Sequence, residues 1–403
     1  MAPHDLPTPS RTLNQPQHPT PPAYPLAGIT VLDLGQIYQG PYCGFLLAMA
    51  GARVIKIEPP QGEPVRSRRG ASLPLAMLNS NKEGVSLDLK SSAGRDAFLS
   101  LVDEADVVLE NFLPGVMDRL GIGGHALLAR NPRLIFASAS GYGSTGPYRD
   151  LLAMDLTIQA MSGMMNATGF ADRPPVKAGP SICDFLGGAH LYGAIVTALF
   201  ERSRTGVGRI CEVAMLDAAY IALTSTIGLH FDNPDAHPRT GSRHAGLAMA
   251  PYNVYPTADG WVSIICVKEE HWRGVARAMG RDVLSDSPRF ATHAARCAIM
   301  EEVDALVGEW TARRTREEVM EAAGIHRFPA APVREMHEVV RDPHLHARGM
   351  LSDFDHPELG PVVLPNSPLR FDGLSPMPLR ASPSLGQDNA SVLGRITTRS
   401  PTH

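Results

Sequence analysis

Hydrophobic runs alternate with turn residues over the first half of the chain, in the rhythm of strands followed by helices. Residues 29–34 and 53–58 are short apolar runs, and residues 41–50 between them are apolar at helical spacing. A strand–helix–strand unit of this kind predicts two parallel strands. The alternation continues with strand patterns at 85–89, 106–109, 134–137 and 212–215 and helix patterns at 93–103, 184–202 and 217–227. The pattern predicts an open, doubly wound parallel α/β sheet of the Rossmann-like kind.

The second half predicts a smaller α+β domain and then an extended segment. Residues 230–246 are rich in Pro, Gly, Asn, Asp and His, which predicts a loop and a domain boundary. A strand at 261–267 and helices at 270–279, 300–310 and up to Ala323 follow, the last with Thr315 and Glu318 spaced as a capping box. Residues 356–396 are Pro-rich with little periodicity, and we expect them to wrap over a surface. The expected parts are an arm (1–25), a large domain (26–225), a linker with the small domain (226–340), a C-terminal segment (341–396) and a tail (397–403).

Composition excludes several classes of protein. The 403-residue chain has 44% hydrophobic and 19% charged residues, which excludes a wholly disordered protein. Its formal net charge of −4 argues against a nucleic-acid binder. No uninterrupted apolar run reaches the ~20 residues of a membrane span, so we expect no membrane association.

Cysteine usage and the N-terminus predict a cytoplasmic protein. The five cysteines are scattered and form no C-x-x-C pair, which argues against disulfides and a cysteine-rich zinc site. Residues 1–25 hold eight prolines and lack the basic and apolar regions of a signal peptide. We expect a disordered arm there, with a partner-docking segment as the alternative.

Two candidate motifs do not carry chemistry. Residues 141–146 spell the G-x-G-x-x-G pattern, but Pro147 and a turn follow where a dinucleotide site needs a helix. The pattern therefore predicts a loop with tight turns and no NAD site. The histidines have no metal-ligand spacing, so no metal site is expected.

Asp184 begins a long apolar helix pattern and is followed by Gly187 and Gly188. The free N–H groups and the dipole of a helix N-terminus favour a carboxylate anion there, and glycines let a bulky substrate approach. On these residues alone a helix cap is the simpler interpretation, with a nucleophile as the alternative.

Many segments together resemble the family III CoA-transferases, the CaiB/BaiF group that also contains formyl-CoA transferase and α-methylacyl-CoA racemase. The resemblance covers residues 26–396 in family order and spacing. It is carried by residues 31–34, 40–41, 51–60, 79–82, 110–121, 140–147, 155–163, 184–188, 213–217, 251–260, 342–350 and 385–387.

The resemblance implies a CoA-transferase that moves CoA between an acyl-CoA thioester and a carboxylic acid. Asp184 matches the family's nucleophile, which passes through a mixed anhydride and an aspartyl-CoA thioester. No permanently bound cofactor is implied, because CoA is a substrate. The implied CoA contacts are Tyr38, Gln39, Asn79, Lys82, Asn111, Phe112, Arg119, Ser140, Gly141 and Tyr142. Lys82 and Arg119 would meet phosphate oxygens.

Three positions depart from the family pattern. Tyr38 replaces a frequent glutamine, with Gln39 one position later, and Pro59 and Leu113 stand where arginines are frequent. These departures weaken the implied CoA contacts around them.

The racemase branch is the alternative function. It uses a histidine where this chain has Met154, together with the shared aspartate and a glutamate that matches Glu269. Because a racemase needs a proton carrier on each face of the α-carbon and methionine transfers no proton, the sequence favours CoA transfer.

The resemblance also implies an interlocked homodimer, in which the C-terminal segment returns to the large domain. Residues 241–246 lie where some transferases carry a glycine-rich loop over the reacting aspartate. This chain adds Arg243 and His244 to the loop. A guanidinium there could hold the distal carboxylate of a dicarboxylic acid of the succinate type, so we expect such an acid as donor or acceptor.

Overall fold

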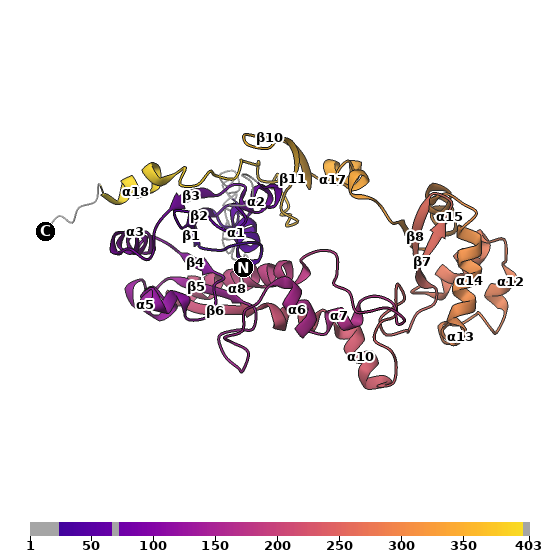
Figure 1. Ribbon diagram of the computed structural model, residues 1–403. Coiled ribbons are helices and arrows are strands. Elements are labelled where there is room, and N and C mark those ends of the chain that lie inside the picture. The colour runs from indigo at the N-terminus through magenta and orange to yellow at the C-terminus, as the bar shows by residue number, and fades with distance from the viewer. Residues whose placement is uncertain (1–23, 67–71, 398–403) are drawn as a thin grey trace, which may run out of the picture.

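The computed structural model describes residues 24–66 and 72–397 (Figure 1). The arm up to residue 23 and the tail from residue 398, both named above, lie outside the described residues. Three sheets organise the described chain: one of six strands, one of three and one of two.

The six-stranded sheet is entirely parallel, with the order β3-β2-β1-β4-β5-β6. This is the doubly wound order, so the predicted α/β sheet is confirmed. Its strands are β1 (Thr30–Asp33), β2 (Arg53–Glu58), β3 (Glu83–Ser86), β4 (Val107–Glu110), β5 (Ile135–Ser140) and β6 (Arg209–Ala214). The chain leaves β1 toward β2 and β3 on one side and returns to β4 on the other, which opens a crevice at the carboxyl ends of β1 and β4.

Helices cover both faces of this sheet, because its strands are apolar on both faces. Helices α1 (Gln39–Met49) and α8 (Ile182–Thr205) bury Leu47, Leu191 and Ile195 against one face. On the other face, α3 (Ser92–Val102), α4 (Val116–Arg119) and α5 (Gly124–Arg130) bury their apolar residues. The connections along the sheet add α2 (Leu73–Asn79), α6 (Asp155–Met161), α7 (Met164–Ala167), α9 (Met215–Ile221) and α10 (Thr224–Asp232).

Helix α8 is long and apolar enough to cross a membrane. Leu191, Ile195, Ala198 and Leu199 of this helix nevertheless belong to the core that it shares with α1 and the sheet. It is the core helix of the sheet unit.

A smaller unit surrounds an antiparallel sheet of β7 (Tyr252–Thr257), β8 (Gly260–Ile265) and β9 (Ala330–Pro332). Helices α11 (Glu269–Ala278), α14 (Met300–Thr311) and α15 (Arg316–His326) pack on it around Trp272 and Trp310. The predicted capping box of Thr315 and Glu318 begins α15. Short helices α12 (Val283–Asp286), α13 (His293–Ala298), α16 (Met336–Val339) and α17 (Pro343–Ala347) complete this region and its exit.

The C-terminal segment is more structured than its composition indicates. The strands β10 (Leu351–His356) and β11 (Gly360–Pro365) form an antiparallel hairpin, and α18 (Asn389–Thr397) follows. Val392 of α18 is buried in the core beside α3. The expectation that residues 356–396 form no core was therefore wrong for α18, although residues 366–388 do run over the sheet unit in an extended form.

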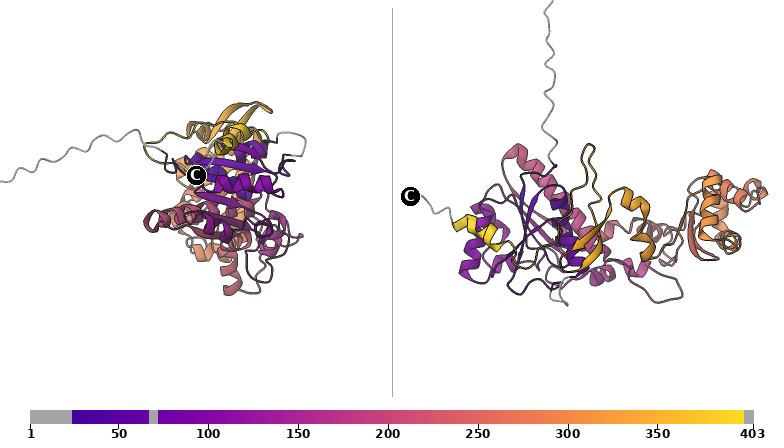
Figure 2. Two further views of the ribbon diagram at one scale, coloured as in Figure 1. Left: turned by 90° about the vertical axis from the view of Figure 1, so that its left-hand side faces the viewer. Right: turned by 90° about the horizontal axis from the view of Figure 1, so that it is seen from above.

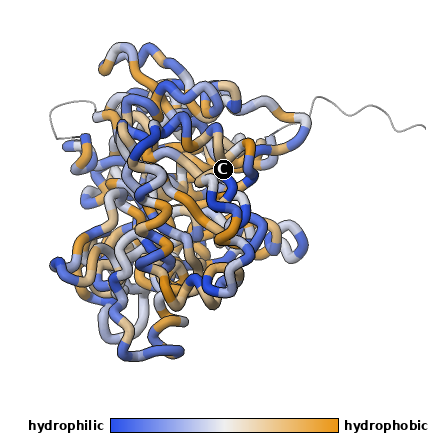
Figure 3. The backbone as a smooth tube through the Cα atoms, turned by 90° about the vertical axis from the view of Figure 1, so that its right-hand side faces the viewer, coloured by the Kyte–Doolittle hydropathy of each residue, from blue (hydrophilic) through white to orange (hydrophobic). Residues whose placement is uncertain are grey.

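The molecule is elongated. In Figure 1 and in the right-hand view of Figure 2, the β7–β9 unit lies at one end, apart from the six-stranded sheet, and loops with the short helix α16 join the two. Along the visible backbone, hydrophobic and hydrophilic residues alternate every few positions (Figure 3). The domain boundaries named above stay predictions.

Candidate active site

A cavity of about 190 Å³ lies at the carboxyl edge of the large sheet. Four loops and one helix build it: the segments after β1, β4, β5 and β6, and the first turn of α8. This is the edge at which ligands bind in open α/β sheets. Its size suits a small acyl group, since sites for whole drug-sized ligands begin near ~300 Å³. The lining residues are Gln36, Ile37, Gln39, Asn111, Phe112, Leu113, Pro114, Ser140, Gly141, Tyr142, Arg149, Leu151, Leu152, Ala153, Met154, Asp184 and Met215.

Asp184 is the one carboxylate among these lining residues. It is the third residue of α8 and only 9% exposed. Burial, and then the nearby charge of Asp155, raise the pKa of Asp184 to about 7. A carboxylate in this state is half ionised near neutral pH and poorly hydrated, which suits it to nucleophilic attack.

Asp155, in the first turn of α6, occupies the cap of α8. Its Oδ1 accepts hydrogen bonds from the backbone N–H groups of Cys183 (2.8 Å) and Asp184 (3.3 Å). Its Oδ2 accepts from Nε2 of the buried Gln159 (2.6 Å). Because Asp155 accepts from these N–H groups, Asp184 does not cap its own helix. The interpretation of Asp184 as a helix cap, which was the simpler one from the sequence alone, is therefore wrong. The sequence analysis placed Asp155 in a segment shared with the family but gave it no role, although its i,i+4 spacing from Gln159 was an available signal.

The start of α1 faces the start of α8 at very close range. A Cβ atom on Gly187 would lie 2.4 Å from Gln39 Nε2, and one on Gly188 would lie 2.7 Å from the Gln39 carbonyl oxygen. The Tyr38 and Phe185 rings stack with centroids 6.3 Å apart. The two glycines therefore let α1 and α8 meet, so that Gln39 and Asp184 line the same cavity.

The turn after β5 also reaches the cavity of Asp184. Gly143 and Gly146 have φ angles of 85° and 83°, and no helix follows them. The predicted tight-turn loop is confirmed here. Its first residues line the cavity, together with a second group: Arg149, Leu151, Leu152, Ala153 and Met154. Of the second group only Met154 was placed near the site from the sequence, because a turn gives no sign of which of its residues fold inward.

Lys82 and Asn79 do not reach the cavity. The side chain of Lys82 is fully buried, and its Nζ pairs with Asp33 Oδ2 (2.7 Å) and donates to Pro41 O and Asn79 Oδ1 (2.9 Å each). All three ammonium protons therefore have protein acceptors. In this structure Lys82 stabilises the fold and is not the phosphate contact that the resemblance implies.

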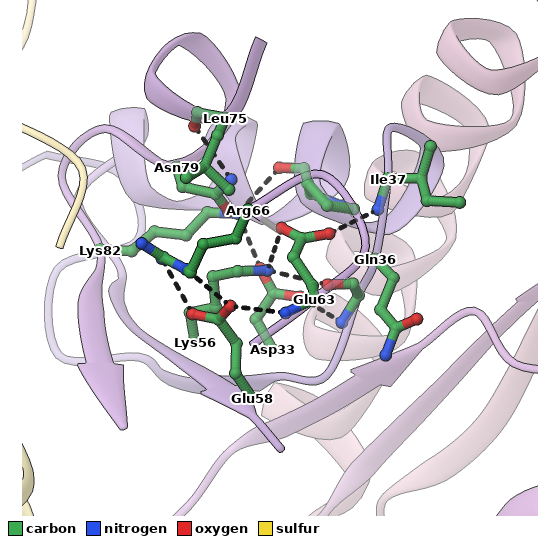
Figure 4. A network of polar contacts seen from close by, with 12 residues as sticks. Asp33, Gln36, Ile37, Lys56, Glu58, Glu63, Arg66, Leu75, Asn79 and Lys82 are labelled. Carbon is green, nitrogen blue, oxygen red and sulfur yellow. Dashed lines mark hydrogen bonds and ion pairs between the residues drawn. The ribbon is translucent and has the colours of Figure 1, made fainter. Parts of the chain in front are cut away.

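A second buried charge group lies beside the first, and Figure 4 shows both. Lys56 Nζ pairs with Glu63 Oε1 (3.0 Å) and donates to Gly35 O (2.9 Å). Glu63 Oε2 accepts from the backbone N–H of Ile37 (2.8 Å), whose φ of 65° is unusual for a β-branched residue. The network thus fixes the loop that carries residues 36–39 into the cavity.

A second cavity adjoins the first at the carboxyl ends of β1–β3 and shares Gln36 and Phe112 with it. Its walls are mainly apolar, and Lys90 is its one cationic residue. The remaining lining residues are Leu34, Ile57, Glu58, Pro59, Pro60, Gln61, Leu87, Asp88, Leu89, Val116 and Leu120. Arg119 is exposed on α4 and lines neither cavity.

Arg243 and His244 lie away from Asp184 within this chain. Arg243 Nε pairs with Asp304 Oδ2 (2.8 Å) of the small unit, and His244 packs against Tyr252 at a centroid distance of 5.4 Å. Neither lines the cavity of Asp184. The expectation that this loop covers the aspartate is therefore not met in the single chain.

Glu269 also lies in the small unit, at the start of α11. Burial acts to raise its pKa, but the hydrogen bond and charge of the buried Arg296 (2.8 Å) bring that pKa below its ordinary value. Met154 is 57% exposed at the rim of the cavity. Among the lining residues of the described chain there is no histidine and no second carboxylate.

Comparisons with known proteins agree with this geometry. The model of "CoA-transferase family III" matches residues 26–389. A succinyl-CoA–D-citramalate CoA-transferase of Chloroflexus aurantiacus is 35% identical over 378 residues, 92% of this chain and 94% of the relative. A succinate–glutarate CoA-transferase of Agrobacterium fabrum is 32% identical over 393 residues, 93% of this chain and 96% of the relative.

Solved structures give the same result. The crystal structure of a CaiB/BaiF family protein from Brucella suis superposes with a TM-score of 0.80 at 32% identity, covering 93% of this chain and all of that one. A match of this extent, together with the doubly wound sheet and the buried Asp184, fixes the assignment. The chain belongs to CoA-transferase family III and is a CoA-transferase.

Proposed function

We propose that this transferase moves CoA between an acyl-CoA thioester and a small dicarboxylic acid, with Asp184 as the nucleophile. The observation that carries the proposal is the position of Asp184. It is buried, has a raised pKa and is the one carboxylate that lines the cavity.

The reaction proceeds in two halves. An Asp184 oxygen attacks the thioester carbonyl, the C–S bond breaks, and CoA thiolate leaves an acyl–aspartyl anhydride. The thiolate then attacks the Asp184 carboxyl carbon and releases the first acid, which leaves aspartyl-CoA. The acceptor carboxylate attacks this thioester to form a second anhydride and thiolate. Attack of the thiolate on the acceptor carbonyl gives the new acyl-CoA and restores Asp184. No water, proton or electron is consumed.

The walls of the cavity support these steps. Asp184 is 9% exposed, and Phe112 and Ala153 add apolar surface to its cavity, which limits the access of water to an anhydride. Hydrolysis at that stage would waste the acyl-CoA.

CoA spans the two adjoining cavities. We place the thioester beside Asp184 and the adenosine in the second cavity, with Phe112 and Gln36 between them. Asn111, Ser140, Gly141 and Tyr142 line the path of the pantetheine arm, and Lys90 is exposed beside the second cavity, where it can meet a phosphate. Lys82 and Asn79 have no part in this placement, because their polar groups are engaged within the fold.

The acid is proposed to be a dicarboxylate, as it is in the names of the relatives from Chloroflexus aurantiacus and Agrobacterium fabrum. Arg149 is the one cation that lines the cavity of Asp184, and its nearest ion-pair partner, Asp150, is 3.5 Å away and exposed. Its guanidinium is free to hold a distal carboxylate, the role that the sequence led us to expect of Arg243.

A panel assay tests the proposed function. The purified protein is incubated with succinyl-CoA or acetyl-CoA and a set of mono- and dicarboxylic acids, and new CoA esters are identified by mass spectrometry. Asp184→Ala and Asp184→Glu should both lose transfer by orders of magnitude, because a missing or misplaced nucleophile forms no anhydride. Near-normal turnover of Asp184→Ala would contradict the proposal.

The same assay tests the acid. Arg149→Gln should raise the KM for dicarboxylates by roughly 10- to 100-fold, as expected for the loss of a charge-assisted contact. The KM for monocarboxylates should change little, and Arg243→Gln serves as the matched comparison. Equal effects of Arg149→Gln on both classes of acid would contradict the dicarboxylate assignment but leave Asp184 unaffected.

Racemisation remains the alternative that the sequence raised. Apart from the Tyr142 hydroxyl, the lining residues offer only Asp184 for proton transfer, and Met154 stands at the position of the racemase histidine. A chiral 2-methylacyl-CoA in deuterated water should therefore take up little deuterium at its α-carbon.

We also propose a cytoplasmic location, in keeping with five cysteines that are all free.

A further inference from the structure

Gln39 carries a hydrogen-bond donor that no residue in the described part of the chain accepts. It is the first residue of α1, its side chain is 1% exposed, and it lines the cavity of Asp184. Within the described residues its Nε2 is buried without a hydrogen-bond partner. A buried amide without a hydrogen-bond partner destabilises a fold. The unpaired amide of Gln39 therefore points to an acceptor that a bound molecule supplies and the free protein lacks.

Helix α8 is shaped around this amide. The absence of a side chain at Gly187 makes room for Gln39 Nε2, which a Cβ atom would approach to 2.4 Å. Gly187 follows Asp184 by three residues, so both positions lie on one face of the helix, about one turn apart. The Gln39 amide and the Asp184 carboxylate therefore flank the same small volume.

Neighbouring amides around the cavity already have acceptors. The backbone N–H of Gln36 donates to Asn111 Oδ1 (2.7 Å), and Asn111 Nδ2 donates to Gln36 O (3.0 Å). Gly143 N–H donates to Ser140 Oγ (2.9 Å). Asp155 takes the first N–H groups of α8. Gln39 Nε2 is thus a buried donor left available for a bound substrate.

We propose that Gln39 is a catalytic residue of this transferase, whose side-chain amide donates a hydrogen bond to the reacting carbonyl oxygen. The proposal rests on the proposed function of Asp184. When a nucleophile adds to the thioester or anhydride carbon, the carbonyl electron pair moves onto oxygen, and the amide stabilises that charge. When the pair returns, the C–S or C–O bond breaks. Gln39 neither gains nor loses a proton in these steps.

This role differs from the CoA contact that the family resemblance implies for Gln39. A contact to CoA would act in the ground state and would appear mainly in the KM for acyl-CoA. A donor to the developing oxyanion acts in the transition state and appears in kcat.

The test compares Gln39→Met with Gln39→Glu. Methionine keeps the length of the side chain without the donor, so kcat should fall by about 10²- to 10³-fold while the KM for acyl-CoA changes little. Glutamate should be at least as poor, because its charge opposes the oxyanion. The unfolding midpoint of Gln39→Met should equal or exceed that of the wild type, because an amide without a partner has been removed.

The outcomes separate the two proposals. A fall in the unfolding midpoint of Gln39→Met with normal kcat would show a structural role, and a raised KM with normal kcat would show a CoA contact. Either result overturns the inference about Gln39 while Asp184→Ala remains inactive. If Asp184→Ala is active, the proposed function itself fails and this inference fails with it.

Discussion

At the scale of single residues, the chemistry of this transferase depends on one carboxyl group whose surroundings the fold has altered. Asp184 is buried at the start of α8, beside the charge of Asp155. Both effects disfavour its ionised form and raise its pKa. The nucleophile is the ionised form, so the two effects must appear in the pH dependence of the reaction.

We predict that kcat/KM rises with pH along a limb whose midpoint lies near 7. The pKa of Asp184 is raised to about 7, so the carboxyl is protonated and inert below that pH and ionised above it. The measurement is kcat/KM for acyl-CoA from pH 5 to 9, made with two different acceptor acids so that titration of the acceptor acid is excluded.

Glu110 supplies the matched control for this profile. Burial raises the pKa of Glu110 to about 7 as well, and its carboxylate accepts the backbone N–H of Phe112 (2.7 Å). Glu110→Gln keeps an acceptor there but does not titrate, so its profile should retain the limb. Loss of the limb in Glu110→Gln would show that the limb comes from Glu110 and would contradict its assignment to Asp184.

We also predict that Lys82→Met lowers stability and leaves substrate binding unchanged. Without Lys82, the fully buried carboxylate of Asp33 has no cationic partner. Breaking such a buried pair lowers the free energy of unfolding by roughly 3–5 kcal/mol. Lys90 is the comparison, since it is exposed beside the second cavity. Lys90→Met should raise the KM for acyl-CoA without changing the free energy of unfolding. Wild-type stability of Lys82→Met with a raised KM would restore Lys82 as a phosphate contact.

At the scale of helices and strands, periodic segments could be predicted and tertiary pairings could not. The strand at 53–58 and the helix that begins at Asp184 are apolar in regular patterns, and both are found close to their expected bounds. The hairpin of β10 and β11 lies in a segment whose prolines conceal any period. Lys82 is a similar case, since its partner Asp33 lies 49 residues away and no local pattern marks the pair.

The docking of α18 is a feature of this scale that can be tested. Val392 is 3% exposed and packs into the core beside α3. We predict that Val392→Ala lowers the free energy of unfolding by about 1.5–3 kcal/mol, the burial energy of such a side chain. The measurement is denaturant unfolding, with the exposed Ser391→Ala as control. Equal stability of the two variants would show that α18 does not contribute to the core.

At the scale of the whole molecule, the separation of the two units is the main feature. The β7–β9 unit lies far from the six-stranded sheet in Figures 1 and 2, and Arg243, His244 and Glu269 go with it. The interlocked homodimer that we expect from the family would bring a second copy's small unit toward the cavity. Exposed apolar residues such as Phe231, Ile221 and Leu152 offer surface for that contact.

We predict that light scattering of the purified chain gives twice the 43.3 kDa of one copy. The mass should not change on dilution through the micromolar range, because interlocked chains bury a large interface. A stable monomer with full activity would contradict the homodimer and would show that one copy holds a complete site.

The transfer of oxygen to Asp184 is the most direct test of the mechanism. The protein is turned over with acyl-CoA and an acceptor acid labelled with oxygen-18, and the peptide that contains Asp184 is then weighed by mass spectrometry. If the anhydride forms, its bridging oxygen comes from the acceptor and stays on Asp184, so that the peptide gains oxygen-18. New acyl-CoA formed over many turnovers without label in that peptide would contradict nucleophilic catalysis by Asp184.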